Sequence, residues 1–225
     1  MGRILFVTGT DTGCGKTFVS TALIHALRAR GERVLAMKPV ASGCESTPDG
    51  LRNADALALQ AAASLQLPYE RVNPFAFAPP IAPHIAAGQA GVRISLDAII
   101  GSARQLAAQC DVLVVEGVGG WRVPLTDTED VADLALRLRA GVVLVVGLRL
   151  GCINHALLTA AAIGAGGARL AGWVGNRLDP GMEHPEENLA TLGARLGAPS
   201  LGCLPHCADT VGPQAVAGHL DLSHL

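Results

Sequence analysis

The feature that most constrains this chain is a glycine-rich stretch near its start, between residues 9 and 17. It follows a short apolar run and leads directly into a helix-like segment over residues 18–30. Glycines let backbone N–H groups approach phosphate oxygens closely, and the start of a helix adds partial positive charge. The order of apolar run, glycine loop, Gly15-Lys16-Thr17 and helix therefore predicts a phosphate-binding loop at a nucleotide site.

Two side chains of this loop have specific expected roles. Lys16 is placed to reach the β- and γ-phosphates, and the Thr17 hydroxyl to ligate Mg²⁺. Five residues rather than four separate Gly9 from Gly15, so the strict motif fits only with Thr10 in the first glycine's place. The alternative is a glycine-rich turn with an exposed lysine. The nucleotide site is favoured because strand, loop and helix follow in the required order.

A second signal lies at residues 110–120. Four consecutive apolar residues, 112–115, predict a strand buried on both faces, as in a parallel sheet. The strand ends at Glu116, where phosphate-loop proteins place a carboxylate that serves Mg²⁺. Thr17, Asp55 and Glu116 would together supply hard oxygen ligands. Asp55 alone also has a structural explanation, since the first turn of a helix favours a carboxylate.

Two polar residues follow the predicted strand over residues 33–38. Lys38 ends this strand and Ser42 comes shortly after it. Ligands of open α/β sheets bind at the carboxyl ends of the strands, which favours a site role over a merely solvated lysine. His155 is expected to pack or cap rather than to catalyse, because no base–nucleophile arrangement accompanies it.

Apolar periodicity places the remaining elements. Residues 68–92 hold five of the thirteen prolines, which predicts an irregular surface segment that shapes one wall of the site. The composition of the last twenty residues predicts a loosely packed C-terminal segment. Alternating strands and helices predict a single domain over residues 1–225, with one mostly parallel sheet between two helical layers. Further strands are expected at 142–147, 170–176 and 200–205, and helices at 51–60, 95–109, 131–139, 150–164 and 183–196.

Composition excludes several classes of protein. The net charge of −2 argues against a nucleic-acid surface, and no apolar run is long enough for a membrane span. The start lacks the layout of a signal peptide, and the six cysteines lack the spacing of a disulfide framework. Cys203, His206 and Cys207 have no second ligand cluster nearby, which argues against zinc. We expect a cytoplasmic protein that binds neither nucleic acid nor membrane.

Several segments together resemble one family, the dethiobiotin synthetases. The resemblance runs from residue 3 to about residue 177, thins afterwards, and includes the extra residue in the phosphate loop. The segments that carry it are 6–12, Gly15-Lys16-Thr17, 38–43, 51–57, 115–121 and 150–155.

The resemblance implies a homodimeric ligase of biotin synthesis that depends on ATP and Mg²⁺. Its substrates would be 7,8-diaminopelargonic acid and CO₂ or bicarbonate. The diamine would form a carbamate with CO₂, the carbamate oxygen would attack the γ-phosphate of ATP, and the second amine would displace phosphate to close the ring. Both partners of the phosphoryl transfer are anionic, so cationic groups such as Lys16, Lys38 and Mg²⁺ suit the chemistry.

Family roles carry over by position. Lys38 and Lys16 would be catalytic, and Thr17, Asp55 and Glu116 would hold the metal. Asn176 would read the base, and the N-terminal end of the helix at 151–154 would bind the substrate carboxylate of the partner subunit. The substrate contacts would be Ser42, Thr12, Gly151, Cys152, Ile153 and Asn154. The nucleotide contacts would be Thr12, Gly13, Cys14, Gly15, Lys16, Thr17, Phe18, Asp55, Glu116, Gly117, Val118, Gly119, Asn176, Arg177, Pro205, His206 and Cys207.

The sequence departs from the family pattern at two places. Asn188 stands where the family often has a tyrosine at the substrate carboxylate, and no acidic residue lies near Gly212. Two other classes of protein fit the sequence less well. A switch ATPase usually carries an additional early lysine in the loop, where this chain has Asp11 and Gly13. An amidotransferase-type synthetase needs a glutaminase domain, for which 225 residues leave no room.

Overall fold

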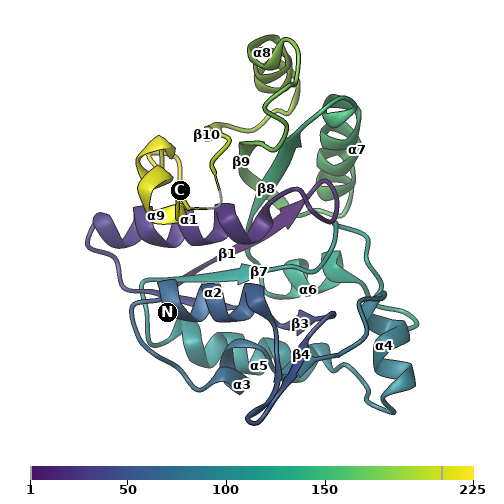
Figure 1. The fold of residues 1–225 in the computed structure, drawn as a ribbon. Coiled ribbons are helices and arrows are strands. Elements are labelled where there is room, and N and C mark those ends of the chain that lie inside the picture. The colour runs from purple at the N-terminus through teal and green to yellow at the C-terminus, as the bar shows by residue number, and fades with distance from the viewer. Residues whose placement is uncertain (1, 209) are drawn as a thin grey trace.

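The computed structural model describes residues 2–208 and 210–225, arranged around one six-stranded sheet (Figure 1). Its strand order is β10-β9-β8-β1-β7-β2, and all neighbouring strands run parallel. Two small two-stranded sheets lie outside it, β3 with β6 and β4 with β5. The strands are β1 (Arg3–Gly9), β2 (Val34–Met37), β3 (Val40–Ala41), β4 (Glu45–Thr47), β5 (Gly50–Arg52), β6 (Phe75–Ala76), β7 (Val112–Glu116), β8 (Gly141–Leu148), β9 (Arg169–Arg177) and β10 (Ser200–Leu204).

Helices cover both faces of the sheet because its strands alternate apolar side chains between two buried sides. Leu5 and Val7 of β1 pack toward α1, α2 and α9, whereas Ile4 and Phe6 pack toward α5 and α6. The helices α7 and α8 continue the second layer over β8 and β9. The helices are α1 (Lys16–Ala29), α2 (Ala54–Ala62), α3 (Tyr69–Val72), α4 (Pro83–Gln89), α5 (Leu96–Ala107), α6 (Val131–Arg137), α7 (Cys152–Ala165), α8 (Pro185–Arg195), α9 (Pro213–Val216) and the 3₁₀ turn η1 (Ala217–His219).

The predicted three-layer α/β fold is confirmed, and polar side chains cap the starts of α2 and α5. Asn53 Oδ1 accepts a hydrogen bond from the Ala56 amide, and Ser95 Oγ accepts one from the Ala98 amide. Both bonds satisfy amides that have no partner inside the helix.

Three expectations were wrong. Residues 51–52 form a strand of the β4–β5 hairpin instead of helix, because the turn before them folds back on itself. Part of the proline-rich segment is regular, since it contains α3, β6 and α4. The C-terminal segment is not loose, because Val216 and Leu222 are buried against the α1 side of the sheet.

No helix in the described residues is long and apolar enough to cross a membrane.

Candidate active site

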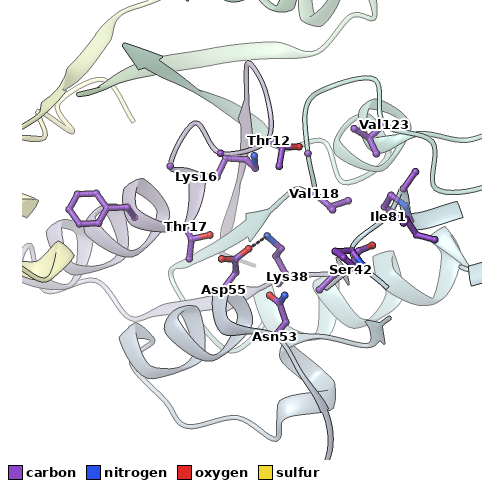
Figure 2. Close-up of a pocket in the computed structure, with 18 residues that line it drawn as sticks. Thr12, Lys16, Thr17, Lys38, Ser42, Asn53, Asp55, Ile81, Val118 and Val123 are labelled. Carbon is purple, nitrogen blue, oxygen red and sulfur yellow. Dashed lines mark hydrogen bonds and ion pairs between the residues drawn. The ribbon is translucent and has the colours of Figure 1, made fainter. Parts of the chain in front are cut away.

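A cleft of about 690 Å³ opens at the carboxyl ends of β1, β2 and β7 (Figure 2). This is the edge of the sheet at which the sequence predicted the site. The cleft is lined by Thr12, Gly13, Gly15, Lys16, Thr17, Phe18, Lys38, Ala41, Ser42, Asn53, Asp55, Pro80, Ile81, Ala82, Pro83, Val118, Gly119 and Val123.

The phosphate loop has a backbone that only glycine adopts easily. Gly13 and Gly15 have φ angles of 75° and 86°, in the left-handed region. A Cβ on Gly15 would lie 2.0 Å from Nδ2 of Asn176. The N-terminal end of α1 therefore opens to the cleft without a side-chain cap. Its free amides are the groups that an anion would satisfy.

Lys16 is held inside this loop. Its ammonium donates to the Asp11 carbonyl at 3.0 Å and lies 4.0 Å from Cys14 Sγ, and the residue is buried. A carbonyl is a weaker partner for an ammonium than a phosphate oxygen. The lysine is thus positioned where an incoming phosphate can replace a neutral acceptor.

Lys38 lies between two carboxylates at the floor of the cleft. Its Nζ is 2.6 Å from Glu116 Oε1 and 2.8 Å from Asp55 Oδ2. Thr17 Oγ1 donates to the same Glu116 oxygen at 2.9 Å. Figure 2 shows the Lys38 and Asp55 side chains pointing toward one another beside Thr17. The structure therefore brings together all three predicted metal ligands and the second predicted catalytic lysine.

The charges of this cluster stabilise each other against burial. Burial alone would lower the pKa of Lys38, but the charges of Glu116 and Asp55 outweigh it and the pKa is raised. Burial alone would raise the pKa of Asp55, but Lys38 outweighs it and the pKa is lowered. The ammonium and the Asp55 carboxylate are consequently both charged at neutral pH.

Two buried oxygens in or beside the cleft have no hydrogen-bond partner among the described residues. They are Ser42 Oγ and Glu116 Oε2, and Glu116 is fully buried. A buried polar atom without a partner carries a desolvation cost that a ligand would remove. Glu116 Oε2, with the oxygens of Thr17 and Asp55, forms a donor set of the kind that Mg²⁺ prefers. The residues present therefore fit a magnesium ion.

The opposite wall of the cleft is apolar. Pro80 to Pro83, from the proline-rich segment, face Val118 and Val123 from the loop after β7. The proline-rich segment was predicted to shape one wall of the site, and its residues 80–83 line the cleft. Val123 was not singled out by the sequence, because an isolated valine in a polar loop carries no periodic signal. The cleft thus offers cations at one end and an alkyl-compatible surface at the other.

Some of the residues that were predicted to contact the nucleotide do not line the main cleft. Asn176 is buried and donates to the Cys14 carbonyl at 3.1 Å, so its amide supports the phosphate loop. The Cys14 side chain is buried beneath that loop. Arg177, which pairs with Glu186, and His206 line a separate hollow of about 220 Å³ at the ends of β8 and β9.

The helix end that was predicted to bind a substrate carboxylate lies outside this chain's own cleft. Residues 151–154 form the N-terminal end of α7, where Gly151 has a φ of 94°, and none of them lines the cleft. Asn188 lies beside this end, with its Oδ1 3.9 Å from Cys152 Sγ. His155 is exposed and not packed, contrary to expectation.

Comparison with solved structures agrees with this architecture. The septum site-determining protein MinD from Pyrococcus horikoshii, solved with Mg-ADP, matches with a TM-score of 0.57 at 17% identity, over 91% of this chain and 82% of that one. The cell division protein FtsY from Thermotoga maritima matches with a TM-score of 0.53 at 17% identity, over 96% and 67%. A family model described as an AAA domain matches residues 3–214. Fold and site together define a phosphate-loop NTPase-type protein.

Curated relatives narrow this class. The ATP-dependent dethiobiotin synthetase BioD of Pseudomonas paraeruginosa is 58% identical over 221 residues, covering 98% of this chain and 96% of the relative. That of Xanthomonas oryzae pv. oryzae is 58% identical over 204 residues, covering 91% of each. The chain belongs to the dethiobiotin synthetase family, whose members are ATP-dependent ligases.

Proposed function

We propose that this protein carboxylates 7,8-diaminopelargonic acid with CO₂ and closes the ureido ring to give dethiobiotin, converting ATP to ADP and phosphate. The observation that carries the proposal is the convergence of Lys16, Lys38, Thr17, Asp55 and Glu116 on one cleft with an apolar wall. The cations suit two anionic reactants, and the apolar wall suits the alkyl chain of the substrate.

The reaction requires no side-chain nucleophile. One amine of the diamine adds to CO₂ and loses a proton, which gives a carbamate. A carbamate oxygen then attacks the γ-phosphate, the bond to ADP breaks, and a carbamic–phosphoric anhydride forms. The second amine attacks the carbamate carbon, loses a proton and expels phosphate, which closes the ring.

The chain's own residues position these groups. Lys16 would exchange the Asp11 carbonyl for phosphate oxygens, and Lys38 would hold the carbamate after leaving its carboxylate partners. Ser42 Oγ, which has no partner among the described residues, would contact the substrate. Thr17, Asp55 and Glu116 would hold Mg²⁺, which when bound neutralises the negative charge of the transferring phosphoryl group.

We propose a homodimer of cytoplasmic location in which residues 151–154 bind the substrate carboxylate of the neighbouring subunit. The distance of this helix end from the chain's own cleft supports a site completed by a second copy. Leu150 beside it is 99% exposed and Leu158 on α7 is 62% exposed, as expected of a surface that another subunit covers. The adenine contacts are proposed at Asn176, Arg177 and the 205–207 loop.

The test is phosphate release from MgATP with and without the diamine and bicarbonate, with product mass read in the same tube. Release that depends on the diamine, together with the dethiobiotin mass, would establish the ligase. Steady hydrolysis indifferent to the diamine would refute it and favour a switch ATPase. In the same assay, Lys38→Ala should still bind nucleotide but lose turnover. Weakened ATP affinity with normal turnover at saturating ATP would contradict the proposed role of Lys38 in holding the carbamate.

A further inference from the structure

A second hollow lies at the edge of the sheet opposite the cleft. It has a volume of about 460 Å³ and sits at the amino ends of β1, β8 and β9. We call it the basic pocket, because four of the residues that line it are arginines and none is acidic. Its lining is Gly2, Arg3, Ile4, Arg104, Leu138, Arg139, Gly141 and Arg169.

Three of these arginines have no internal partner. Arg104, Arg139 and Arg169 form no ion pair and donate no side-chain hydrogen bond within the described residues. Some arginines elsewhere, such as Arg137, pair with carboxylates, whereas others, such as Arg93 and Arg195, are unpaired among the described residues but line no shared hollow with other arginines. Arg3 is the exception in the pocket, since it pairs with Glu32 at 2.7 Å. Three uncompensated guanidinium groups therefore converge on one hollow.

Two backbone features lie at the rim of the pocket. Arg139 has a φ of 53°, one of two non-glycine residues with positive φ among those described. This left-handed residue closes the C-terminal end of α6, where the Ala140 amide donates to the Ala135 carbonyl at 3.3 Å, and the conformation is costly for a side chain larger than glycine or asparagine. Gly141 follows, and a Cβ there would lie 2.9 Å from Arg169 Nη2. The glycine thus leaves room for the Arg169 guanidinium to lie across the start of β8.

Helix ends account for only part of this arrangement. The helices α5 and α6 end at Ala107 and Arg137, and cations near such ends are favourable. The left-handed turn at the end of α6 explains the φ of Arg139, but neither that turn nor the helix dipole requires an arginine at this position, where glycine is preferred, or an open hollow between the cations. A bound anion accounts for both, because guanidinium groups from several elements must then face one point.

We propose that the basic pocket binds a compact phosphate-type anion of two or more negative charges, such as a diphosphate group. Guanidinium favours this chemistry because its planar donors match phosphate oxygens two at a time. The volume lies within the range of small-molecule sites, so the diphosphate is either free or carried on a nucleoside. This site is separate from the cleft and does not depend on the proposed reaction.

The experiment is a calorimetric titration with inorganic pyrophosphate and, in a parallel arm, with ADP, both in metal-free buffer. Lys16→Gln serves as the background, since it disables the phosphate loop and leaves the basic pocket as the remaining site. The double variant Arg139→Gly, Arg169→Gln is compared in this background with the matched control Arg93→Gly, Arg195→Gln. Arg93 and Arg195 are also exposed and unpaired among the described residues, so both double variants lose the same charge.

We expect one pyrophosphate or ADP per chain, with binding weakened at least tenfold by the pocket variant and unchanged in the control. A preference for pyrophosphate would identify a free diphosphate, and a preference for ADP a nucleoside diphosphate. Arg139→Gly relieves the positive φ, so circular dichroism should show a folded variant, and Arg139→Lys gives a second folded test. Absence of binding in the Lys16→Gln background, or equal weakening in both double variants, would overturn the proposal.

Discussion

Removing the ammonium of Lys38 is the sharpest test of how the candidate site is held together. Its side chain is 4% exposed and its partner Glu116 is fully buried, so Lys38→Met leaves a carboxylate without its cation in the interior. Breaking a buried ion pair in this way costs about 3–5 kcal/mol of unfolding free energy. Methionine has a similar shape, so little of the loss comes from packing.

The measurement is urea unfolding of the nucleotide-free protein, followed by circular dichroism. Lys16→Met is the matched control, because that ammonium is also buried but donates only to a carbonyl and a thiol. Its loss should cost about 0.5–1.5 kcal/mol, the net value of an ordinary hydrogen bond. The double variant Lys38→Met, Glu116→Gln should regain much of the stability lost by Lys38→Met. Equal effects of the two lysine variants, or simple additivity in the double variant, would refute the reasoning.

Three further predictions concern the cleft. Gly15→Ala should lower stability by about 1–3 kcal/mol and abolish ATP binding by calorimetry, because φ is 86° and the new Cβ meets Asn176. Ser42→Ala should leave the urea midpoint unchanged or raise it, because it removes a buried hydroxyl that has no partner among the described residues, yet raise KM for the diamine roughly 2- to 10-fold. Asp55 has a lowered pKa, so its contribution is complete above its unfolded value of 3.8 and disappears as pH falls through the folded value. Acid titrations of wild type and Asp55→Asn should therefore converge once the pH falls below the folded-state pKa of Asp55, and a constant gap would contradict this.

The parts of the fold that the sequence predicted well are those whose residues face a buried environment on every side. The strand 112–115 is apolar throughout and lies between β1 and β2, covered by helices on both faces, so its buried strand was predicted correctly. The C-terminal segment was mispredicted for the opposite reason. Only a few apolar side chains, such as Val216 and Leu222, anchor it, and they gain their partners from α1 far away in the chain.

The same distinction applies to the candidate site. Lys38 and Glu116 were expected near one another because strand ends of a parallel sheet meet at one edge, whereas Asp55, in the first turn of a helix, was expected there as a third oxygen ligand. That Lys38 bonds both carboxylates depends on side-chain directions, which no spacing rule gives. The Asn176 amide, which was expected at the base, donates to the Cys14 carbonyl through a space that Gly15 leaves open, and no spacing rule gives this contact.

One signal in the sequence anticipates the cleft more directly than any motif spacing. Lys16 and Lys38 are the only lysines in the chain, and every other basic side chain besides histidine is an arginine. Both lysines are buried at the cleft, whereas no arginine in the described part of the chain is buried and some of them form ion pairs at the surface. An ammonium is a compact charge on a flexible stem and can exchange one oxygen partner for another within a small space, whereas a guanidinium needs a planar set of acceptors. Lysine is therefore the cation suited to the proposed reaction, in which phosphate and carbamate oxygens would replace a carbonyl and two carboxylates.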